Sequence, residues 1–213
     1  MNSIQLVIFD MDGLMFDTEK TYFDAHINDF KQLNLKYNAD AFMKSVGTSA
    51  PLDIKHINQS SLSDEEFAQI LSTSYNNAVE NMIENGVPLK KGLFELLNKI
   101  DSKKIPMVVA TSTPIEISGR LLKKAGVFDR FKYVVTAKDV KHGKPAPDIF
   151  LKACDMCHIR PENALVLEDS EAGCLAAYAA GIPYIVVPDM KQPPEEVKKH
   201  ALLVAGSLFD VIG

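Results

Sequence analysis

Short apolar runs alternate with longer amphipathic segments along most of the chain. The runs predict strands at 6–9, 106–110, 133–136, 164–167 and 184–187, with a last short edge strand at 202–204. The first run, Leu6 to Phe9, is too short for an independent helix and suits a strand buried on both faces. The segments at 93–100, 114–125, 146–158 and 170–180 have helical character. Strands separated by helices form right-handed βαβ units, so we predict an α/β fold, a parallel sheet with helices on both faces.

Residues 18–86 have a different pattern, with apolar positions three and four apart and no convincing strand. Ser63-Asp-Glu-Glu66 has the spacing of a capping box before a helix, and Asn85 to Pro88 ends the segment with turn residues. We therefore expect a helical bundle inserted into the sheet domain. The predicted division is a cap domain at 17–87 and a core domain formed by 1–16 and 88–213.

Two acids follow the first predicted strand. Asp10 and Asp12 stand where the apolar run stops, and Gly13 permits a sharp turn beside them. In an α/β sheet, ligands bind at this carboxyl edge. Two neighbouring carboxylates raise each other's pKa unless a cation lies between them, and Mg²⁺ prefers such oxygen ligands. The alternative is that Asp-x-Asp-Gly is only a solvated turn.

Polar residues also follow two later strands. Thr111, Ser112 and Thr113 precede a helix, where hydroxyls and free N–H groups form either an anion site or a simple N-cap. Glu168 and Asp169 precede another helix, whose dipole alone would favour acids there.

A basic loop lies between these two strands. Lys144 stands between a glycine and a proline, which restrict its direction, although a lone lysine is most often a solvated surface group.

Composition narrows the classes of function. The chain has 213 residues, 46% hydrophobic and 24% charged, with a formal net charge of −5. Without a basic cluster, a nucleic-acid or anionic-membrane partner is not expected. No apolar run reaches transmembrane length and no signal-peptide pattern precedes the first strand, so we expect a cytoplasmic protein. Cys154, Cys157 and His158 spell a haem-attachment motif, but the segment is a predicted amphipathic helix, in which these cysteines are small core residues.

Asp10-Met-Asp-Gly13, Thr111, Lys144-Pro-Ala-Pro147 and Glu168-Asp169, in this order, resemble the motifs of the haloacid dehalogenase superfamily of phosphotransferases. The β-phosphoglucomutase and sugar-phosphate phosphatase branch is the most similar. The resemblance covers the whole chain, with the helical insert at the position of that family's cap. It implies a Rossmann-like core and a cap that closes over substrate, with hinges near 16–18 and 86–88.

The resemblance also implies roles for these residues. Asp10 would be the nucleophile that forms an aspartyl phosphate, and Asp12 the general acid and base. Mg²⁺ would be held by the Asp10 carboxylate, the Asp12 main-chain carbonyl and Asp169, with Glu168 either beside the ion or behind a water. Thr111, Ser112 and Lys144 are expected to bind the phosphoryl group.

Three functions remain in competition. We favour a Mg²⁺-dependent phosphomonoester hydrolase, a monomer whose partner is a small phosphorylated metabolite such as a sugar or polyol phosphate. The first alternative is a phosphomutase of the β-phosphoglucomutase type, but Tyr22 stands where mutases of this branch have a histidine, and Gly47-Thr-Ser-Ala50 lacks their arginine. The second is a non-catalytic phospholigand-binding protein. Specificity is expected to lie in the cap, near 47–49, Tyr22 and His26.

Overall fold

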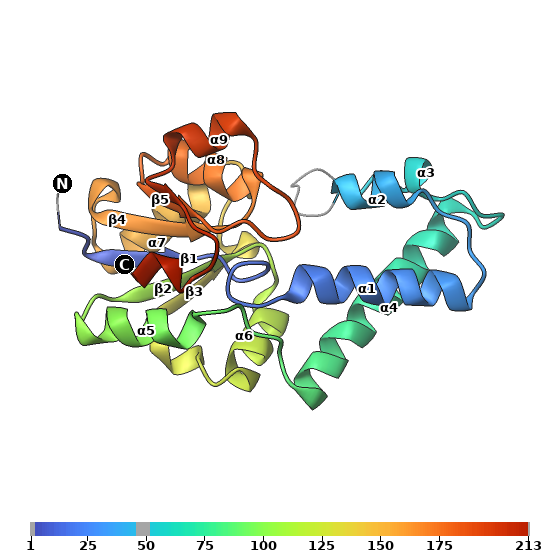
Figure 1. The fold of residues 1–213 in the computed structure, drawn as a ribbon, viewed down its shortest axis with the longest axis horizontal. Helices are drawn as coiled ribbons and strands as arrows, with labels where there is room; N and C mark the ends of the chain where they lie inside the picture. Colours follow the sequence, from blue (N-terminus) through green and yellow to red (C-terminus); the bar gives the residue numbers. More distant parts are fainter. Residues whose placement is uncertain (1–2, 46–51, 213) are drawn as a thin grey trace.

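The computed structural model describes residues 3–45 and 52–212, and the chain forms a sheet domain with a helical cap at one end (Figure 1). The strands are β1 (Leu6–Phe9), β2 (Met107–Thr111), β3 (Tyr133–Thr136), β4 (Ala164–Glu168), β5 (Tyr184–Val186) and β6 (Leu203–Val204). The helices are α1 (Thr18–Gln32), α2 (Ala39–Ser45), α3 (Ile54–Ile57), α4 (Asp64–Asn85), α5 (Leu93–Ser102), α6 (Ile115–Lys124), α7 (Asp148–Cys157), α8 (Glu171–Ala179) and α9 (Glu195–His200).

The sheet is parallel, with strand order β3-β2-β1-β4-β5-β6. β1 lies at its centre because four consecutive apolar residues are buried from both sides. Val7 and Phe9 face one core cluster, which includes residues of α5 and α6, whereas Leu6 and Ile8 face the other, which includes residues of α7 and α8. The predicted α/β fold, with helices on both faces, is confirmed.

The pairing register brings three strand ends to one edge. Phe9 of β1 pairs with Val109 of β2 on one side and with Leu167 of β4 on the other. β2 and β4 each extend one residue further than predicted, so Thr111 and Glu168 are their last residues. Asp10, directly after β1, therefore lies at the same edge of the sheet as these two residues.

The inserted helical cap is also confirmed. Long helices α1 and α4 pack together, and the capping box predicted at Ser63 and Glu66 is present at the start of α4. Aromatic rings hold the distal part of the cap: Phe30 lies between Phe42 and Phe67, with ring centroids 5.0 Å apart for Phe30 and Phe67. The cap therefore has a small apolar core of its own, away from the sheet.

Two short linkers join cap and core, and they pair with each other. Phe16 forms a β-bridge with Leu89, and the Asp17 N–H donates to the Pro88 carbonyl over 2.9 Å. These contacts lie at the boundaries proposed from the sequence, between 16 and 17 and between 87 and 88. The division into domains at these positions and the hinges near them stay predictions.

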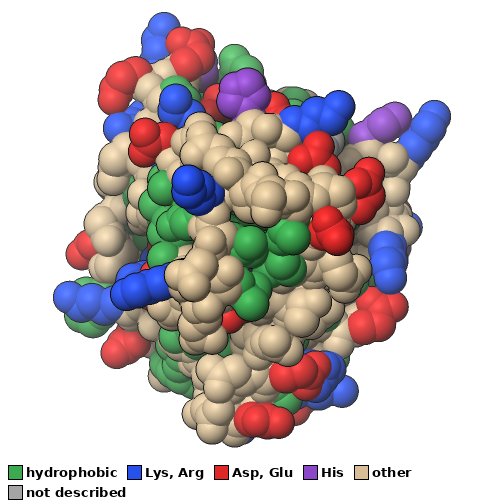
Figure 2. All heavy atoms as spheres, turned by 90° about the vertical axis from the view of Figure 1, so that its right-hand side faces the viewer, with side chains coloured by type: hydrophobic (Ala, Val, Ile, Leu, Met, Phe, Trp, Pro, Cys, Tyr) green, Lys and Arg blue, Asp and Glu red, His purple; other side chains and the backbone are tan. Residues whose placement is uncertain are grey.

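The surface of the cap end carries both signs of charge. Figure 2 shows acidic and basic side chains intermingled around apolar side chains on this face. Among the described parts of the chain, no helix combines the length and apolarity needed to span a bilayer. Cys154, Cys157 and Cys174 are free and buried in the sheet domain, as expected of core residues.

The residue before α5, Gly92, packs closely against the backbone of Phe209, and a substitution there tests this contact. Gly92 has a φ of 90°, and a Cβ there would lie 2.2 Å from the Phe209 backbone nitrogen. Gly92→Ala should lower the free energy of unfolding by roughly 2–4 kcal/mol, the sum of left-handed strain and overpacking. Gly126→Ala is the matched control, because Gly126 has a φ of 71° but open space at its Cβ. Equal losses for the two variants in chemical denaturation would contradict this packing.

Candidate active site

Lys144 is the buried centre of the candidate site. Its ammonium donates to Asp10 Oδ1, to Glu168 Oε1 over 2.6 Å and to the Ala110 carbonyl over 3.1 Å. Burial alone would lower its pKa, but the charges of Asp10 and Glu168 outweigh burial and raise the pKa of Lys144. The lysine is therefore a fixed cation beneath the end of β1, not a solvated surface group.

Glu168 is held at both carboxylate oxygens. Lys144 binds Oε1, while Oε2 accepts from the backbone N–H groups of Asp169 and Ser170, each over 3.0 Å, and from the Ser170 hydroxyl over 2.9 Å. Gly173 on the first turn of α8 leaves room for this carboxylate, since a Cβ there would lie 1.7 Å from Oε1. The side chain is thus fixed by the protein before any ligand binds.

Asp12 is bound by three hydroxyls from two segments. Its Oδ1 accepts from Thr18 over 2.7 Å, and its Oδ2 accepts from Thr113 over 2.6 Å and, more weakly, from Thr111 over 3.4 Å. Thr18 belongs to the first cap helix, whereas Thr111 is the last residue of the core strand β2 and Thr113 follows that strand. The orientation of Asp12 therefore depends on both domains.

One cavity of about 160 Å³ collects the residues predicted from the sequence. Its lining includes Asp10, Asp12, Thr111, Ser112, Lys144 and Asp169. The structure thus brings together every predicted site residue, from four separate segments. Ser112 and Thr111 both line this cavity, and the Thr111 hydroxyl also accepts from the Thr113 N–H over 3.1 Å.

The acids of this cavity fit a divalent cation. One carboxylate oxygen from each of Asp10, Glu168 and Asp169 lies within 4.8 Å of the other two. Burial, followed by the neighbouring acids, raises the pKa of Asp169 well above its usual range, and burial also raises that of Asp10 although Lys144 opposes it. Three buried carboxylates thus share one ammonium, and the excess negative charge suits a hard cation with oxygen ligands. The Asp12 main-chain carbonyl stays a prediction as a ligand.

A second cavity, of about 280 Å³, continues from Asp12 toward the cap. Its lining includes Glu19, Tyr22, His26, Phe42 and Tyr75. The rings of Tyr22 and Tyr75 lie 4.5 Å apart, and burial lowers the pKa of His26. Tyr22 and His26 therefore face the space predicted to set specificity, whereas the predicted segment 47–49 lies outside the described residues.

Several residues of the site were not predicted. Glu19 lines both cavities, and burial, followed by the charges of Asp12 and Asp189, raises its pKa to about 7. Thr18 binds Asp12 and was not predicted. Thr113 was predicted only as part of an anion site or N-cap, and its hydrogen bond to Asp12 was not. Asp189 follows the predicted strand at 184–187 and a proline, so its place after a strand end was a usable signal.

Comparison with known proteins shows to which family the chain belongs. The family model described as haloacid dehalogenase-like hydrolase matches residues 7–187. The chain belongs to the haloacid dehalogenase-like hydrolase family. This membership confirms the resemblance found in the sequence motifs.

The relatives narrow the comparison. The chain is 29% identical over 182 residues to a phosphorylated carbohydrates phosphatase of Thermotoga maritima, covering 85% of this chain and 84% of that protein. It is 32% identical over 185 residues to a fructose-1-phosphate phosphatase of Escherichia coli, covering 85% and 95%. A solved β-phosphoglucomutase from Clostridium difficile superposes with a TM-score of 0.72 at 25% identity, covering 97% and 92%. The expectation of a haloacid dehalogenase-like phosphatase is confirmed.

The close approach of α8 to Glu168 can be tested by adding one methyl group. Gly173→Ala should lower the free energy of unfolding by about 1–3 kcal/mol, because the new Cβ displaces a buried carboxylate that Lys144 holds. Gly119→Ala on α6 is the control, since a Cβ there meets only ordinary contacts at 3.9 Å. Thermal unfolding that ranks the two variants in the opposite order would refute the placement of Glu168.

Proposed function

We propose that this enzyme hydrolyses the phosphomonoesters of small sugars or polyols, using Mg²⁺ and an aspartyl phosphate on Asp10. The observation that carries the proposal is the ion cluster at the end of β1, in which Lys144 binds Asp10 and Glu168 beside Asp169. A phosphate dianion repels a carboxylate nucleophile, so the attack requires cations around both. This cluster supplies one cation and the ligands for another.

The proposed steps assign separate work to the two aspartates. A carboxylate oxygen of Asp10 forms a bond to phosphorus as the ester oxygen leaves, and Asp12 gives the leaving oxygen its proton. Asp12 then takes a proton from a water whose oxygen attacks phosphorus, which releases inorganic phosphate and restores Asp10. The hydroxyls of Thr18 and Thr113 support this exchange, since a hydroxyl can donate to the ionised Asp12 or accept from the protonated one.

In this proposal Asp10 and Asp169 hold the metal ion, and Glu168 positions Lys144. Both oxygens of Glu168 already have protein partners, whereas no hydrogen bond to the Asp169 carboxylate is found among the described residues. When bound, Mg²⁺ would neutralise charge on the phosphoryl oxygens and on Asp10. Lys144 keeps the nucleophile oriented, and Ser112 and Thr111 offer polar groups to the phosphoryl group.

The leaving group is assigned to the cavity between Asp12 and the cap. The aromatic faces of Tyr22 and Tyr75 suit the C–H face of a sugar or polyol, and Glu19 suits its hydroxyls. The names of the two phosphatase relatives, which act on phosphorylated carbohydrates and fructose 1-phosphate, support the same class. Monomeric state, cytoplasmic location and the absence of nucleic-acid or membrane partners stay predictions.

Charge in this cavity favours a hydrolase over a phosphomutase. A mutase must hold a second phosphate at the cap, yet the described lining contains Asp12 and Glu19 and no lysine or arginine. Residues 46–51 contain no lysine or arginine either. His26 does not replace them, because burial lowers its pKa and favours the neutral ring. A second phosphate would thus meet two acids there.

Loss of the nucleophile tests the proposed chemistry. Asp10→Asn should reduce phosphate release from fructose 1-phosphate or glycerol 3-phosphate with Mg²⁺ by at least about 10³-fold, since an amide cannot form the phosphorylated intermediate. Asp24→Asn, on the exposed side of α1, is the control and should retain activity. An Asp10→Asn protein that releases phosphate as fast as the parent protein would contradict the proposed mechanism.

The same assay separates hydrolase from mutase. Incubation with β-glucose 1-phosphate and its bisphosphate activator should give inorganic phosphate without glucose 6-phosphate, because the described lining of the cavity between Asp12 and the cap contains no lysine or arginine for a second phosphate. Nuclear magnetic resonance of phosphorus distinguishes the products. Isomerised sugar phosphate without free phosphate would establish the mutase alternative instead.

A further inference from the structure

Asp189 has one anchored and one unpartnered carboxylate oxygen. The side chain, in the segment after β5, is 8% exposed. Lys90 donates to Oδ1, whereas Oδ2 is buried and has no hydrogen-bond partner among the described residues. A buried carboxylate oxygen without a partner is costly and calls for an ion or a water.

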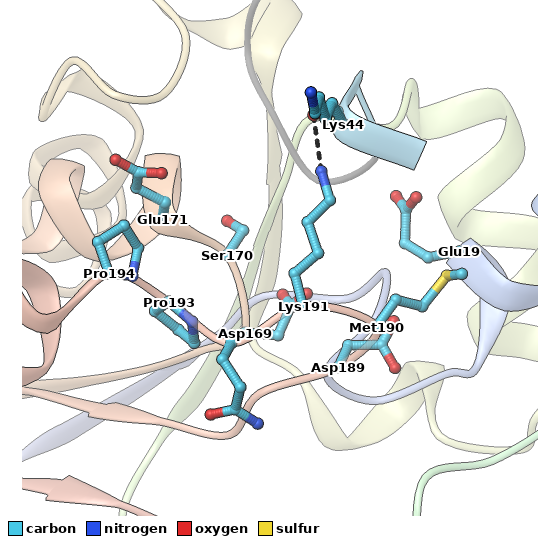
Figure 3. A pocket seen from close by; sticks show the side chains of 11 residues that line it. Glu19, Lys44, Asp169, Ser170, Glu171, Asp189, Met190, Lys191, Pro193 and Pro194 are labelled. Carbon is cyan, nitrogen blue, oxygen red and sulfur yellow. Dashed lines mark hydrogen bonds between the residues drawn. The ribbon is translucent and has the colours of Figure 1, made fainter. Parts of the chain in front are cut away.

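The unpartnered oxygen faces the acidic cluster. A Cβ built on Gly13 would lie 2.4 Å from Asp169 Oδ2 and 3.1 Å from Asp189 Oδ2, so both oxygens approach the same point of the backbone. Figure 3 shows Asp169 and Asp189 together in the cavity lined by the loop at 189–194 and by Lys44 of the cap. After burial, Glu168 and Asp10, the charge of Asp189 also raises the pKa of Asp169.

Asp189 is nevertheless too far away to belong to the three-carboxylate group. That group contains Asp10, Glu168 and Asp169 only, among the residues described by the structure. Protein-bound Mg²⁺ usually keeps several waters, and residues that bind those waters orient the ion. An unpaired oxygen next to a ligand, but outside the ligand group, is suited to that task.

We propose that Asp189 is a positioning residue of the magnesium site: Lys90 fixes its Oδ1, and its Oδ2 accepts a hydrogen bond from a water in the hydration shell of the ion. This inference rests on the proposed function, since it requires Mg²⁺ at Asp10 and Asp169. Asp189 lies outside the motifs that resemble those of the family.

Lys90 connects this residue to the cap linkers. Its backbone N–H donates to the Met15 carbonyl over 3.0 Å, and its ammonium lies 3.8 Å from Asp17 Oδ1 as well as against Asp189. Met15 and Asp17 flank the first linker, and Lys90 follows the second. The orientation of Asp189 therefore depends on the pairing of the two linkers that join the cap to the core.

The test is the affinity of the metal-free protein for Mg²⁺, measured by isothermal titration calorimetry. Asp189→Asn keeps the shape and an acceptor for Lys90, and it should raise the Kd for Mg²⁺ roughly tenfold or more. Glu171→Gln, an exposed acid lining the same cavity, is the matched control and should change the Kd by less than about twofold. An unchanged Kd in a folded Asp189→Asn protein would overturn the proposal and leave Asp189 as a tether for Lys90.

A double-mutant cycle tests the part assigned to Lys90. In the parent protein, Lys90→Met should change the Kd for Mg²⁺. In the Asp189→Asn background the same substitution should change the Kd by less than about twofold, because Lys90 acts through Asp189. Equal changes of the Kd in both backgrounds would show that Lys90 does not act through Asp189, and would overturn the role proposed for Lys90. Thermal unfolding of each variant verifies that the comparison is made between folded proteins.

Asp169→Asn separates failure of this inference from failure of the proposed function. If that variant loses Mg²⁺ binding and Asp189→Asn does not, the inference fails and the magnesium site stands. If the parent protein itself does not bind Mg²⁺ at millimolar concentrations, the magnesium site and the inference fail together.

Discussion

The buried contact of one ammonium with two carboxylates organises this molecule. Lys144 joins the end of β1, through Asp10, to the end of β4, through Glu168, and to the end of β2, through the Ala110 carbonyl. Removing one partner of such a buried pair typically costs about 3–5 kcal/mol, because the remaining charge is left without compensation. The crossover loop that carries Lys144 is therefore fixed to three strands at once.

The same contact explains why the site needs a further cation. Asp10 and Glu168 already exceed the charge of Lys144, and Asp169 adds a third carboxylate in the same buried space. Burial, together with the neighbouring acids, raises the pKa of Asp10 and Asp169, although the charge of Lys144 opposes this rise. Close backbone approach at Gly13 and Gly173 makes the crowding possible, since neither position has space for a side chain. The residues that hold these strand ends together are thus the same ones to which the proposal assigns the metal ion.

Much of this arrangement could be predicted from the sequence, for physical reasons that differ between its parts. The strands were evident because residues buried on both faces form uninterrupted apolar runs, as in Leu6 to Phe9. The acids and hydroxyls of the candidate site were predictable because they stand at the ends of those strands, and parallel strands end at a common edge. Lys144 lies in a loop instead, and only its glycine and proline neighbours set it apart. What could not be predicted depends on side-chain direction: the hydroxyls of Thr18 and Thr113 on Asp12, and the turn of Asp189 toward Asp169. The strand ends at Thr111 and Glu168 differed by one residue because polar side chains with buried partners can continue a strand.

The central claim is that Asp10 and Asp169 hold a divalent cation next to Lys144 at the end of β1. Anomalous X-ray diffraction from crystals soaked with Mn²⁺ in place of Mg²⁺ measures this directly. The account predicts one strong peak within bonding distance of carboxylate oxygens of Asp10 and Asp169, on the side of Asp10 away from the Lys144 ammonium. Crystals that bind Mn²⁺ only elsewhere, or that show Lys144 turned away from Asp10, would contradict it.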